Sequence, residues 1–274
     1  MDWLDSDPAT TRCGLQPKQE SPTGFMTMAS LSKTIVFEDK PQIFEGLSEE
    51  SLERIIANST LHGIDAGVIL VHQGDAPASI YVTVRGALRT YRSNSNGNEA
   101  TIRMLKPGDS CMEAVMFMGG PSPINVEAVE NSVVLMIPER VVKAQVLDDA
   151  QFATNLLRIV ARHYKNTMHQ VDGMNMKTPL QRVGYYFLLR HIEAGHDTLD
   201  VDLPFQKKLI ANYLGMTPET FSRVLKQMRE YGIDVGSSRI RLRDAFTLCH
   251  FCDTDSAALC PHGSDAVCSR CPPH

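Results

Sequence analysis

The sequence contains no long apolar run and little cysteine outside its last 26 residues. No uninterrupted apolar stretch approaches the ~20 residues that a helix needs to cross a bilayer, so we expect no membrane partner. The N-terminus lacks a basic region followed by an apolar core, which predicts a cytoplasmic protein without a secretory signal. Cys13 and Cys111 are isolated, which excludes a disulfide framework spread through the fold and indicates a reducing compartment.

Familiar catalytic motifs are missing as well. The sequence has no phosphate-binding P-loop, no nucleophile elbow and no HExxH zinc motif, so we expect a protein that is not an enzyme. Its 274 residues are enough for two domains with cores of their own. A hydrophobic content of 43% and a charged content of 22% are typical of globular proteins.

Two short helical patterns lie within residues 207–229 and flank a turn at Gly215 and Met216. In the second pattern Thr217 can cap the helix, and Pro218 occupies the first position, where its missing N–H is not needed. The pattern predicts a helix-turn-helix whose second helix lies in a DNA major groove. An ordinary amphipathic helical hairpin would share the same apolar spacing. The residues expected to face DNA are Thr217, Glu219, Ser222, Arg223 and Lys226.

A β-hairpin is predicted directly after the second helix, over residues 232–243, with its turn at 236–238. A hairpin in this position makes a winged helix, and Arg239, Arg241 and Arg243 on its second strand can contact phosphates. Residues 207–243 hold eight lysines and arginines against three acidic residues, although the whole chain carries a net charge of −5. A basic segment in an acidic protein indicates a local surface for a polyanion. We therefore add Lys207 and Arg239 to the predicted DNA contacts.

The chain as a whole divides into five segments. Residues 1–40 are polar and irregular. The sensor segment 41–140 begins with a short helical entry over 41–62, and short strand-like runs then alternate with turn signals over 64–140, which predicts a jelly roll or barrel. Apolar residues at three- and four-residue steps over 141–176 predict a long helix suited to dimerisation, or else packed back on its own barrel. We expect a winged helix-turn-helix over 177–246 and a cysteine-rich tail over 247–274. The predicted helical stripe comprises Phe152, Leu156, Ile159, Val160, His163, Thr167, Gln170, Val171 and Met174.

Several motifs resemble the CRP/FNR family of bacterial transcription regulators, from about residue 43 to residue 246. Residues 43–48 (IFEGLS), 67–75 (GVILVHQGD) and 107–109 (PGD) are similar to its entry motif, strand–turn motif and effector loop. The resemblance implies an α+β fold: a cyclic-nucleotide-binding-like β-roll, a long dimerisation helix and a C-terminal winged helix-turn-helix. It also implies a homodimer with double-stranded DNA and RNA polymerase as partners.

The segment 219–223 (ETFSR) is similar to the FNR-type recognition motif. By that resemblance Glu219 accepts a hydrogen bond from a cytosine amino group, Arg223 donates to guanine, and Ser222 assists. The implied target is an inverted repeat of TTGAT half-sites, whose two-fold symmetry matches that of a dimer.

The expected effector pocket differs from that of the cyclic-nucleotide-binding members. Glu113 stands at the family's ribose position, but Met112 replaces the preceding glycine, and residues 121–125 (PSPIN) lack the arginine that would pair with a cyclic phosphate. Burying that phosphate without a cation is unfavourable, so we predict that cyclic AMP does not bind. The predicted pocket residues are Met112, Glu113, Met116 and Asn125.

Residues 112–118 (MEAVMFM) resemble instead the nitric-oxide-responsive DNR branch, which implies heme in the sensor domain. Heme needs an iron ligand and an apolar slot, although a single histidine is more often structural than a ligand. The iron–sulfur mechanism of FNR itself does not transfer, because the N-terminal region offers only Cys13. The histidines in or near the sensor half are His62, His72, His163 and His169.

Five of the seven cysteines lie in the last 26 residues. Cys249 with Cys252, and Cys268 with Cys271, form two Cys-x-x-Cys pairs separated by fifteen residues, which is a zinc-site spacing. Four thiolates could equally hold an iron–sulfur cluster, with Cys260 as an alternative ligand. A tail that binds nothing is also compatible with the sequence.

Together these features predict a homodimeric, site-specific transcription regulator that responds to nitric oxide, oxygen or redox state rather than to cyclic AMP. Two alternatives stay open. One is a zinc- or redox-switch regulator that uses the C-terminal cysteines and a purely structural β-roll. The other is a cyclic-nucleotide-binding regulatory protein with no role on DNA.

Overall fold

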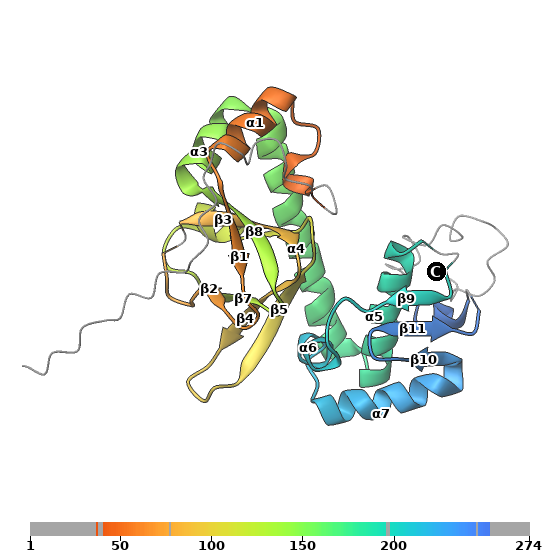
Figure 1. Ribbon diagram of the computed structural model, residues 1–274. Helices are drawn as coiled ribbons and strands as arrows, with labels where there is room; N and C mark the ends of the chain where they lie inside the picture. The colour runs from red at the N-terminus through yellow and green to blue at the C-terminus, as the bar shows by residue number, and fades with distance from the viewer. Residues whose placement is uncertain (1–36, 38–40, 77, 196–197, 245, 253–274) are drawn as a thin grey trace, which may run out of the picture.

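The computed structural model describes residues 37, 41–76, 78–195, 198–244 and 246–252. The N-terminal half is a β-roll of two four-stranded antiparallel sheets, with strand orders β1-β8-β3-β6 and β2-β7-β4-β5 (Figure 1). Buried side chains such as Val82, Leu88 and Leu135 fill the roll. Its elements are η2 (Gln42–Phe44), α1 (Glu49–Ala57), β1 (Thr60–Ile64), β2 (Ile69–Val71), β3 (Ser79–Arg85), β4 (Leu88–Ser93), β5 (Glu99–Leu105), β6 (Ser110–Cys111), α2 (Glu113–Met118), β7 (Asn125–Ala128) and β8 (Ser132–Pro138).

Two helices follow the roll, where the sequence predicts one over 141–176. α3 (Glu139–Asp148) ends before Asp149, and α4 (Ala150–Met176) begins after it. The Asp149 backbone is extended, and its carboxylate accepts hydrogen bonds from the N–H groups of Gln151 and Phe152. A side chain that satisfies two N–H groups at a helix start favours a new helix over a continuous one. The expectation of one uninterrupted helix was therefore wrong at Asp149.

The long helix α4 runs from the roll to the C-terminal half (Figure 1). Phe152, Leu156 and Ile159 near its start are buried in the core of the roll. Leu157 and Tyr164, in contrast, are 71% and 68% exposed. The predicted stripe thus combined two faces: its first residues pack on the chain's own roll, and the exposed apolar face comprises Leu157, Tyr164, Met168 and Val171.

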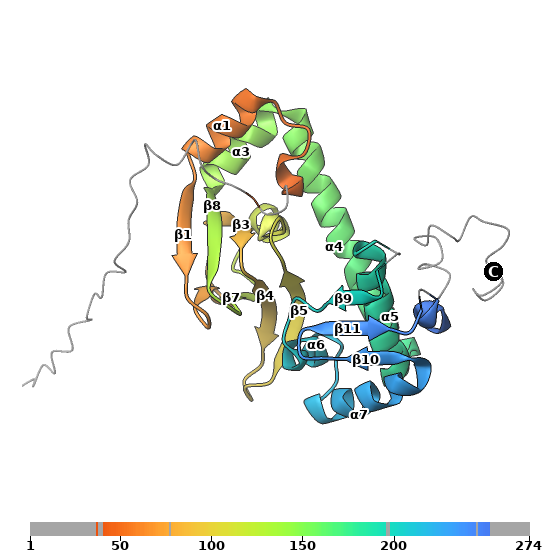
Figure 2. The ribbon, with the colours of Figure 1, turned by 45° about the vertical axis from the view of Figure 1, so that its right-hand side comes forward.

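The C-terminal half is a helical domain with a three-stranded antiparallel sheet of order β10-β11-β9 (Figure 2). Thr178 caps α5 in a capping box with Gln181, and Pro179 occupies the first helical position. Phe187, Phe221 and Ile210 fill the core. The elements are α5 (Pro179–Glu193), β9 (Asp200–Asp202), α6 (Lys207–Tyr213), α7 (Pro218–Met228), η3 (Arg229–Tyr231), β10 (Ile233–Val235), β11 (Arg239–Leu242) and η4 (Thr247–Phe251).

The helix η4 belongs to this core, although the sequence predicts a separate tail from residue 247. Leu248 is fully buried, and Phe251 packs against α5. The large apolar side chains at these positions explain the difference, because they bury surface that a solvated tail would expose.

The two halves meet where α6 lies beside the edge strand β5 (Figure 2). The Asn212 Oδ1 accepts a hydrogen bond from the Thr101 N–H at 2.7 Å, and its Nδ2 donates to the Glu99 carbonyl at 3.0 Å. One amide side chain thus occupies part of the open hydrogen-bonding edge of the sheet. Within the described part of the chain, no helix is both long and apolar enough to cross a membrane.

Candidate DNA-binding surface and sensor pocket

The helix α7 lies at the outer edge of the C-terminal domain (Figure 1). The Thr217 Oγ1 accepts a hydrogen bond from the Thr220 N–H at 3.2 Å and so caps the helix. Phe221, Val224 and Met228 are buried, which fixes the rotation of the helix about its axis. The opposite face therefore points to solvent. It carries the predicted DNA contacts Glu219, Ser222, Arg223 and Lys226.

The charge of Glu219 is set within the first turn of α7. The helix N–H groups are unpaired there, and the Glu219 N–H lowers the pKa of its own carboxyl, with smaller contributions from Thr217 and Arg223. The side chain is thus an ionised acceptor at neutral pH. A carboxylate one turn from a guanidinium gives this surface both an acceptor and a donor.

Arg239 and Arg241 of the wing are paired with aspartates on β9, and Arg243 is paired with Asp244. The Arg239 Nε lies 2.8 Å from the Asp202 Oδ1, and the Arg241 Nε lies 3.1 Å from the Asp200 Oδ1. These pairs form because β11 is bonded to β9, with Arg239 opposite Asp202 in the register. The sequence count of charges over 207–243 left out both aspartates, so the surface is less basic than that count indicates.

Lys207 takes a supporting position beside the wing. Its side chain is partly buried, and its Nζ lies 3.5 Å from the Val235 carbonyl. It thereby links the start of α6 to β10, whereas the other predicted DNA contacts are exposed.

Glu113 and Met112 lie together inside the roll at the start of α2. Glu113 is 1% exposed, and burial raises the pKa of its carboxyl, opposed by the charge of Arg103 and a hydrogen bond from Ser110. Met112 has φ = 78°, so it is the one residue other than glycine with a positive φ in the described part of the chain. That conformation is normally taken by glycine, the residue that Met112 replaces. Met116, on α2 itself, is buried in the core.

The buried Asn125 side chain links two neighbouring segments of the roll by hydrogen bonds. Its Oδ1 accepts a hydrogen bond from the Gln73 N–H at 2.9 Å, and its Nδ2 donates to the Tyr91 carbonyl at 3.5 Å. Both ends of the amide are therefore bonded to the backbone of neighbouring segments. Nearby, the Ser122 hydroxyl is bonded to the backbone of Ile124.

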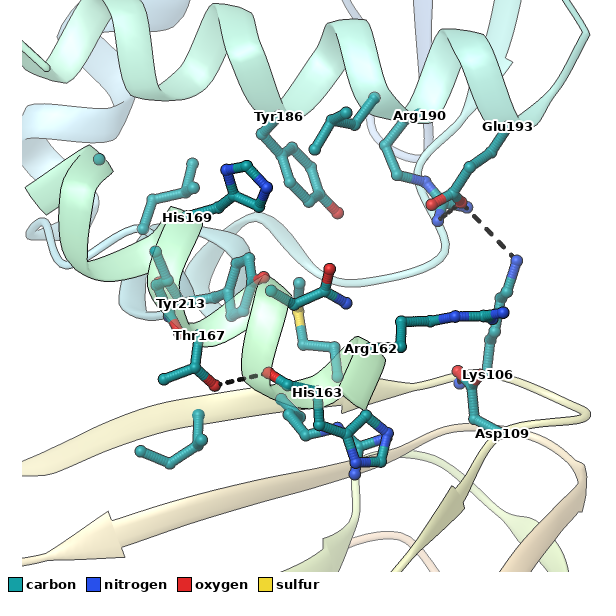
Figure 3. Close-up of a pocket in the computed structure, with 18 of the residues that line it drawn as sticks. Lys106, Asp109, Arg162, His163, Thr167, His169, Tyr186, Arg190, Glu193 and Tyr213 are labelled. Atoms are coloured by element: carbon teal, nitrogen blue, oxygen red, sulfur yellow. Dashed lines mark hydrogen bonds and ion pairs between the residues drawn. The ribbon is translucent and has the colours of Figure 1, made fainter. Parts of the chain in front are cut away.

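A cavity of about 540 Å³ lies where the roll, α4 and α5 meet (Figure 3). Its walls come from segments 102–110, 159–174 and 182–193, with further residues from the C-terminal domain. Met112, Glu113, Met116 and Asn125 do not line it. No sequence pattern predicts this cavity, because three segments far apart in the chain must meet before it exists.

The comparisons with known proteins follow the same division of the chain. The model of a cyclic nucleotide-binding domain matches residues 62–149, and that of a Crp-like helix-turn-helix domain matches 181–251. The transcriptional activator protein FnrA of Stutzerimonas stutzeri is 28% identical, over 67% of this chain and 76% of its own length. The chain belongs to the CRP/FNR family of transcription regulators.

Further members of the CRP/FNR family agree with this assignment. The anaerobic regulatory protein of Pasteurella multocida is 28% identical, over 68% of this chain and 69% of its own. FixK2 from Bradyrhizobium japonicum shares the fold with a TM-score of 0.63 at 24% identity, over 71% of this chain and 98% of its own. The expected α+β fold, with a β-roll, a long helix and a C-terminal winged helix-turn-helix, is thus confirmed.

The structure separates the four histidines considered as heme ligands. His62 is bonded to the Thr60 hydroxyl at 3.1 Å, and His72 is exposed. His163 and His169 line the cavity (Figure 3). The pKa of His163 is lowered to about 3 by burial and by Arg103 and Arg162. A wall with two cations beside the histidine does not fit the apolar faces of a porphyrin, so this cavity is not suited to heme.

The cysteine tail is placed only at its start. Cys249 and Cys252 are partly buried, in the last turn of η4 and at its C-cap. Cys260, Cys268 and Cys271 lie outside the described residues, so the predicted site of four thiolates stays a prediction. Among the described residues, no group of three or more His, Cys, Asp or Glu side chains is arranged to hold a metal.

Proposed function

We propose that this CRP/FNR regulator binds, as a homodimer, an FNR-like palindrome of TTGAT half-sites and that it responds to nitric oxide, oxygen or redox state rather than to cyclic AMP. The observation that carries the DNA part is the exposed edge of α7, where Glu219, Ser222 and Arg223 share one face. The relatives named for anaerobic regulation support the signal class, since they match over most of this chain.

Each of the three side chains has a role that its chemistry allows. The Glu219 carboxylate accepts from a cytosine amino group, and the Arg223 guanidinium donates to guanine O6 and N7. Ser222 lies one position before Arg223 and can bond to either kind of base. Lys226, one turn further along α7, then meets the phosphate backbone, which contributes affinity without selecting sequence.

The exposed apolar face of α4 supplies the dimer contact in this proposal. Leu157, Tyr164 and Val171 are spaced by seven residues, and Met168 lies four residues after Tyr164. This is the spacing at which two helices pack in a coiled coil. Two copies joined there present two α7 helices to two half-sites, which must be about one DNA turn apart.

A DNA titration tests the base contacts. We expect the wild-type protein to prefer a duplex with two TTGAT half-sites over a scrambled duplex of equal length, measured by fluorescence anisotropy. Arg223→Ala removes a guanine contact worth about 1–3 kcal/mol of discrimination, so the preference is lost while weak, salt-sensitive binding stays. The control Arg158→Ala removes an exposed arginine from α4 and leaves the preference intact. An unchanged preference in Arg223→Ala would refute the assignment.

A second candidate function is a metal or redox switch at the C-terminus. It is favoured by Cys249 and Cys252, two partly buried cysteines three residues apart next to the DNA-binding core. Metal analysis and an absorption spectrum of protein purified without air separate the cases. Zinc alone supports a structural tail, visible charge-transfer bands support an iron–sulfur cluster, and a Soret band supports heme in the sensor.

A further inference from the structure

The cavity between the two halves is built from parts of both. Lys106 directly follows β5 of the roll. Arg162 and His163 come from α4, and Tyr186 and Arg190 come from α5 (Figure 3). Its volume of about 540 Å³ is within the range of small-molecule sites in proteins. A molecule bound there would contact the sensor domain and the DNA-binding domain at the same time.

Cations outnumber carboxylates on its walls. Asp109 and Glu193 supply the carboxylates, and Glu193 already pairs with Arg190 at 2.5 Å and with Lys106 at 3.7 Å. Arg162 has no carboxylate within ion-pair distance among the described residues, and its guanidinium extends toward Lys106 (Figure 3). The cationic wall residues are Arg103, Lys106, Arg162, Lys177, Arg182 and Arg190.

Among the described residues, three buried polar groups on the cavity walls have no hydrogen-bond partner. The Tyr186 hydroxyl points into the cavity from a side chain that is only 8% exposed, and it is unbonded within the described structure (Figure 3). The Nε atoms of Arg182 and Arg190 are also buried and unbonded within the described structure. Burial raises the pKa of Tyr186, so its hydroxyl remains a donor. Because unbonded buried donors are unfavourable, these groups indicate an acceptor that belongs in the cavity.

We propose that this cavity binds a small organic or inorganic molecule with two or more oxyanion groups, phosphate or carboxylate. One group pairs with Arg162 and Lys106, and another accepts the hydrogen bond of the Tyr186 hydroxyl beside Arg190. Guanidinium groups suit this ligand class, because they bind both carboxylate and phosphate oxygens through two parallel hydrogen bonds. The site is separate from the predicted effector pocket in the roll, which the cavity does not reach.

A ligand of this kind would also hold the two halves in one arrangement. α5 is the first helix of the DNA-binding domain, and the roll contributes Lys106 from the opposite wall. Leu157, Tyr164, Met168 and Val171 do not line the cavity, so a dimer through that face leaves the site intact. Binding at the cavity needs no DNA, and its test is therefore independent of the DNA titration described above.

Pyrophosphate and citrate are suitable probes, since each carries two or more oxyanion groups. We expect either anion to raise the thermal unfolding midpoint of the full chain in a saturable way, beyond sodium chloride at equal ionic strength. Isothermal titration calorimetry then gives the Kd. Tighter binding of pyrophosphate indicates a phosphate-bearing ligand, and tighter binding of citrate a carboxylate-bearing one.

Two variants and one control locate the binding. Arg162→Gln should weaken the Kd about tenfold or more, because a charged hydrogen bond is lost. Tyr186→Phe should weaken it roughly three- to tenfold and leave the free protein as stable as before, because its hydroxyl has no partner to lose. Arg158→Gln, an exposed arginine one turn away that does not line the cavity, should bind like wild type. The proposal is overturned if neither anion gives a saturable shift, or if Arg162→Gln binds them as tightly as wild type.

Discussion

The absence of a side chain at Gly184 determines how closely η4 packs on α5 of the DNA-binding domain. A Cβ added to Gly184 on α5 would lie 2.1 Å from the Phe251 Cγ, far inside van der Waals contact. We expect Gly184→Ala to lower the free energy of unfolding by about 1–3 kcal/mol, because Phe251 must move out of its site. Urea denaturation followed by circular dichroism measures this change.

Gly173→Ala is the matched control. It is also a helical glycine replaced by alanine, but an added Cβ there has no atom within 4 Å. Without a clash, alanine should stabilise α4 by about 0.5–1 kcal/mol. Equal effects of the two substitutions would show that Phe251 does not press on α5.

The residues that the sequence placed well are those governed by local periodicity. The inward positions Phe221 and Val224 determine that Glu219 and Arg223 face outward, and the structure agrees. The pairing of Arg239 with Asp202 depends instead on which distant strand joins the wing. The local pattern of residues 239–243 does not tell which strand lies beside them, so the aspartate partners could not be foreseen.

At the scale of elements, β9 moderates the charge of the wing. Asp202 neutralises Arg239 in an exposed pair, which is individually weak but keeps the guanidinium from phosphate. We expect Asp202→Asn to raise the affinity for non-specific duplex DNA severalfold and to steepen the logarithmic salt dependence by up to about one unit, which is one added phosphate contact. Anisotropy titrations at several salt concentrations measure both quantities.

Asp148→Asn provides the comparison for this prediction. It removes the same charge from an exposed ion pair, that of Arg54 with Asp148 at 3.7 Å, but on α3 next to the sensor domain. Its DNA affinity should match that of wild type. If both variants gained affinity equally, net charge rather than the wing would be responsible.

The helix α4 has two apolar faces that differ in exposure. One is buried against the roll, and the other, with Leu157 and Tyr164, is exposed. We expect Leu157→Glu combined with Tyr164→Glu to convert the proposed dimer into a monomer, because two buried carboxylates on each copy would face one another. Sedimentation velocity measures the change. Leu147→Glu, at an 87% exposed position on α3, should leave the dimer unchanged.

This helix also shows why apolar spacing alone was insufficient. The predicted stripe joined Phe152 and Ile159, which are buried, to Val171, which is half exposed. Helical periodicity marks every apolar position on a cylinder, but it does not tell which face meets the chain's own roll and which is free for a partner. That distinction needs the positions of η2, α2 and α3 against α4, which only the folded chain defines.

For the whole molecule, the order of segments was enough to predict the architecture, but it did not predict how the roll and the C-terminal domain contact each other. A roll, a long helix and a winged helix follow one another in the sequence, and each has its own local pattern. The contact of Asn212 with Thr101 and the cavity beside it join residues more than a hundred positions apart in the chain. Interactions at that separation leave no periodic trace, so the surfaces that couple the two domains appear only in three dimensions.

Two features of the roll bear on cyclic AMP binding, namely the loop 119–125 and the residue before Glu113. The nucleotide needs a cation for its phosphate, whereas residues 119–125 contain none and Ser122 is bonded to its own loop. It also needs close backbone approach before Glu113, where the Met112 side chain is buried instead. We therefore expect no thermal shift at millimolar cyclic AMP. A ligand present at a hundred times its Kd would add about 2.7 kcal/mol to the free energy of unfolding. A saturable rise in the unfolding midpoint would show that another cation reaches the phosphate and that the sensor has kept a nucleotide site.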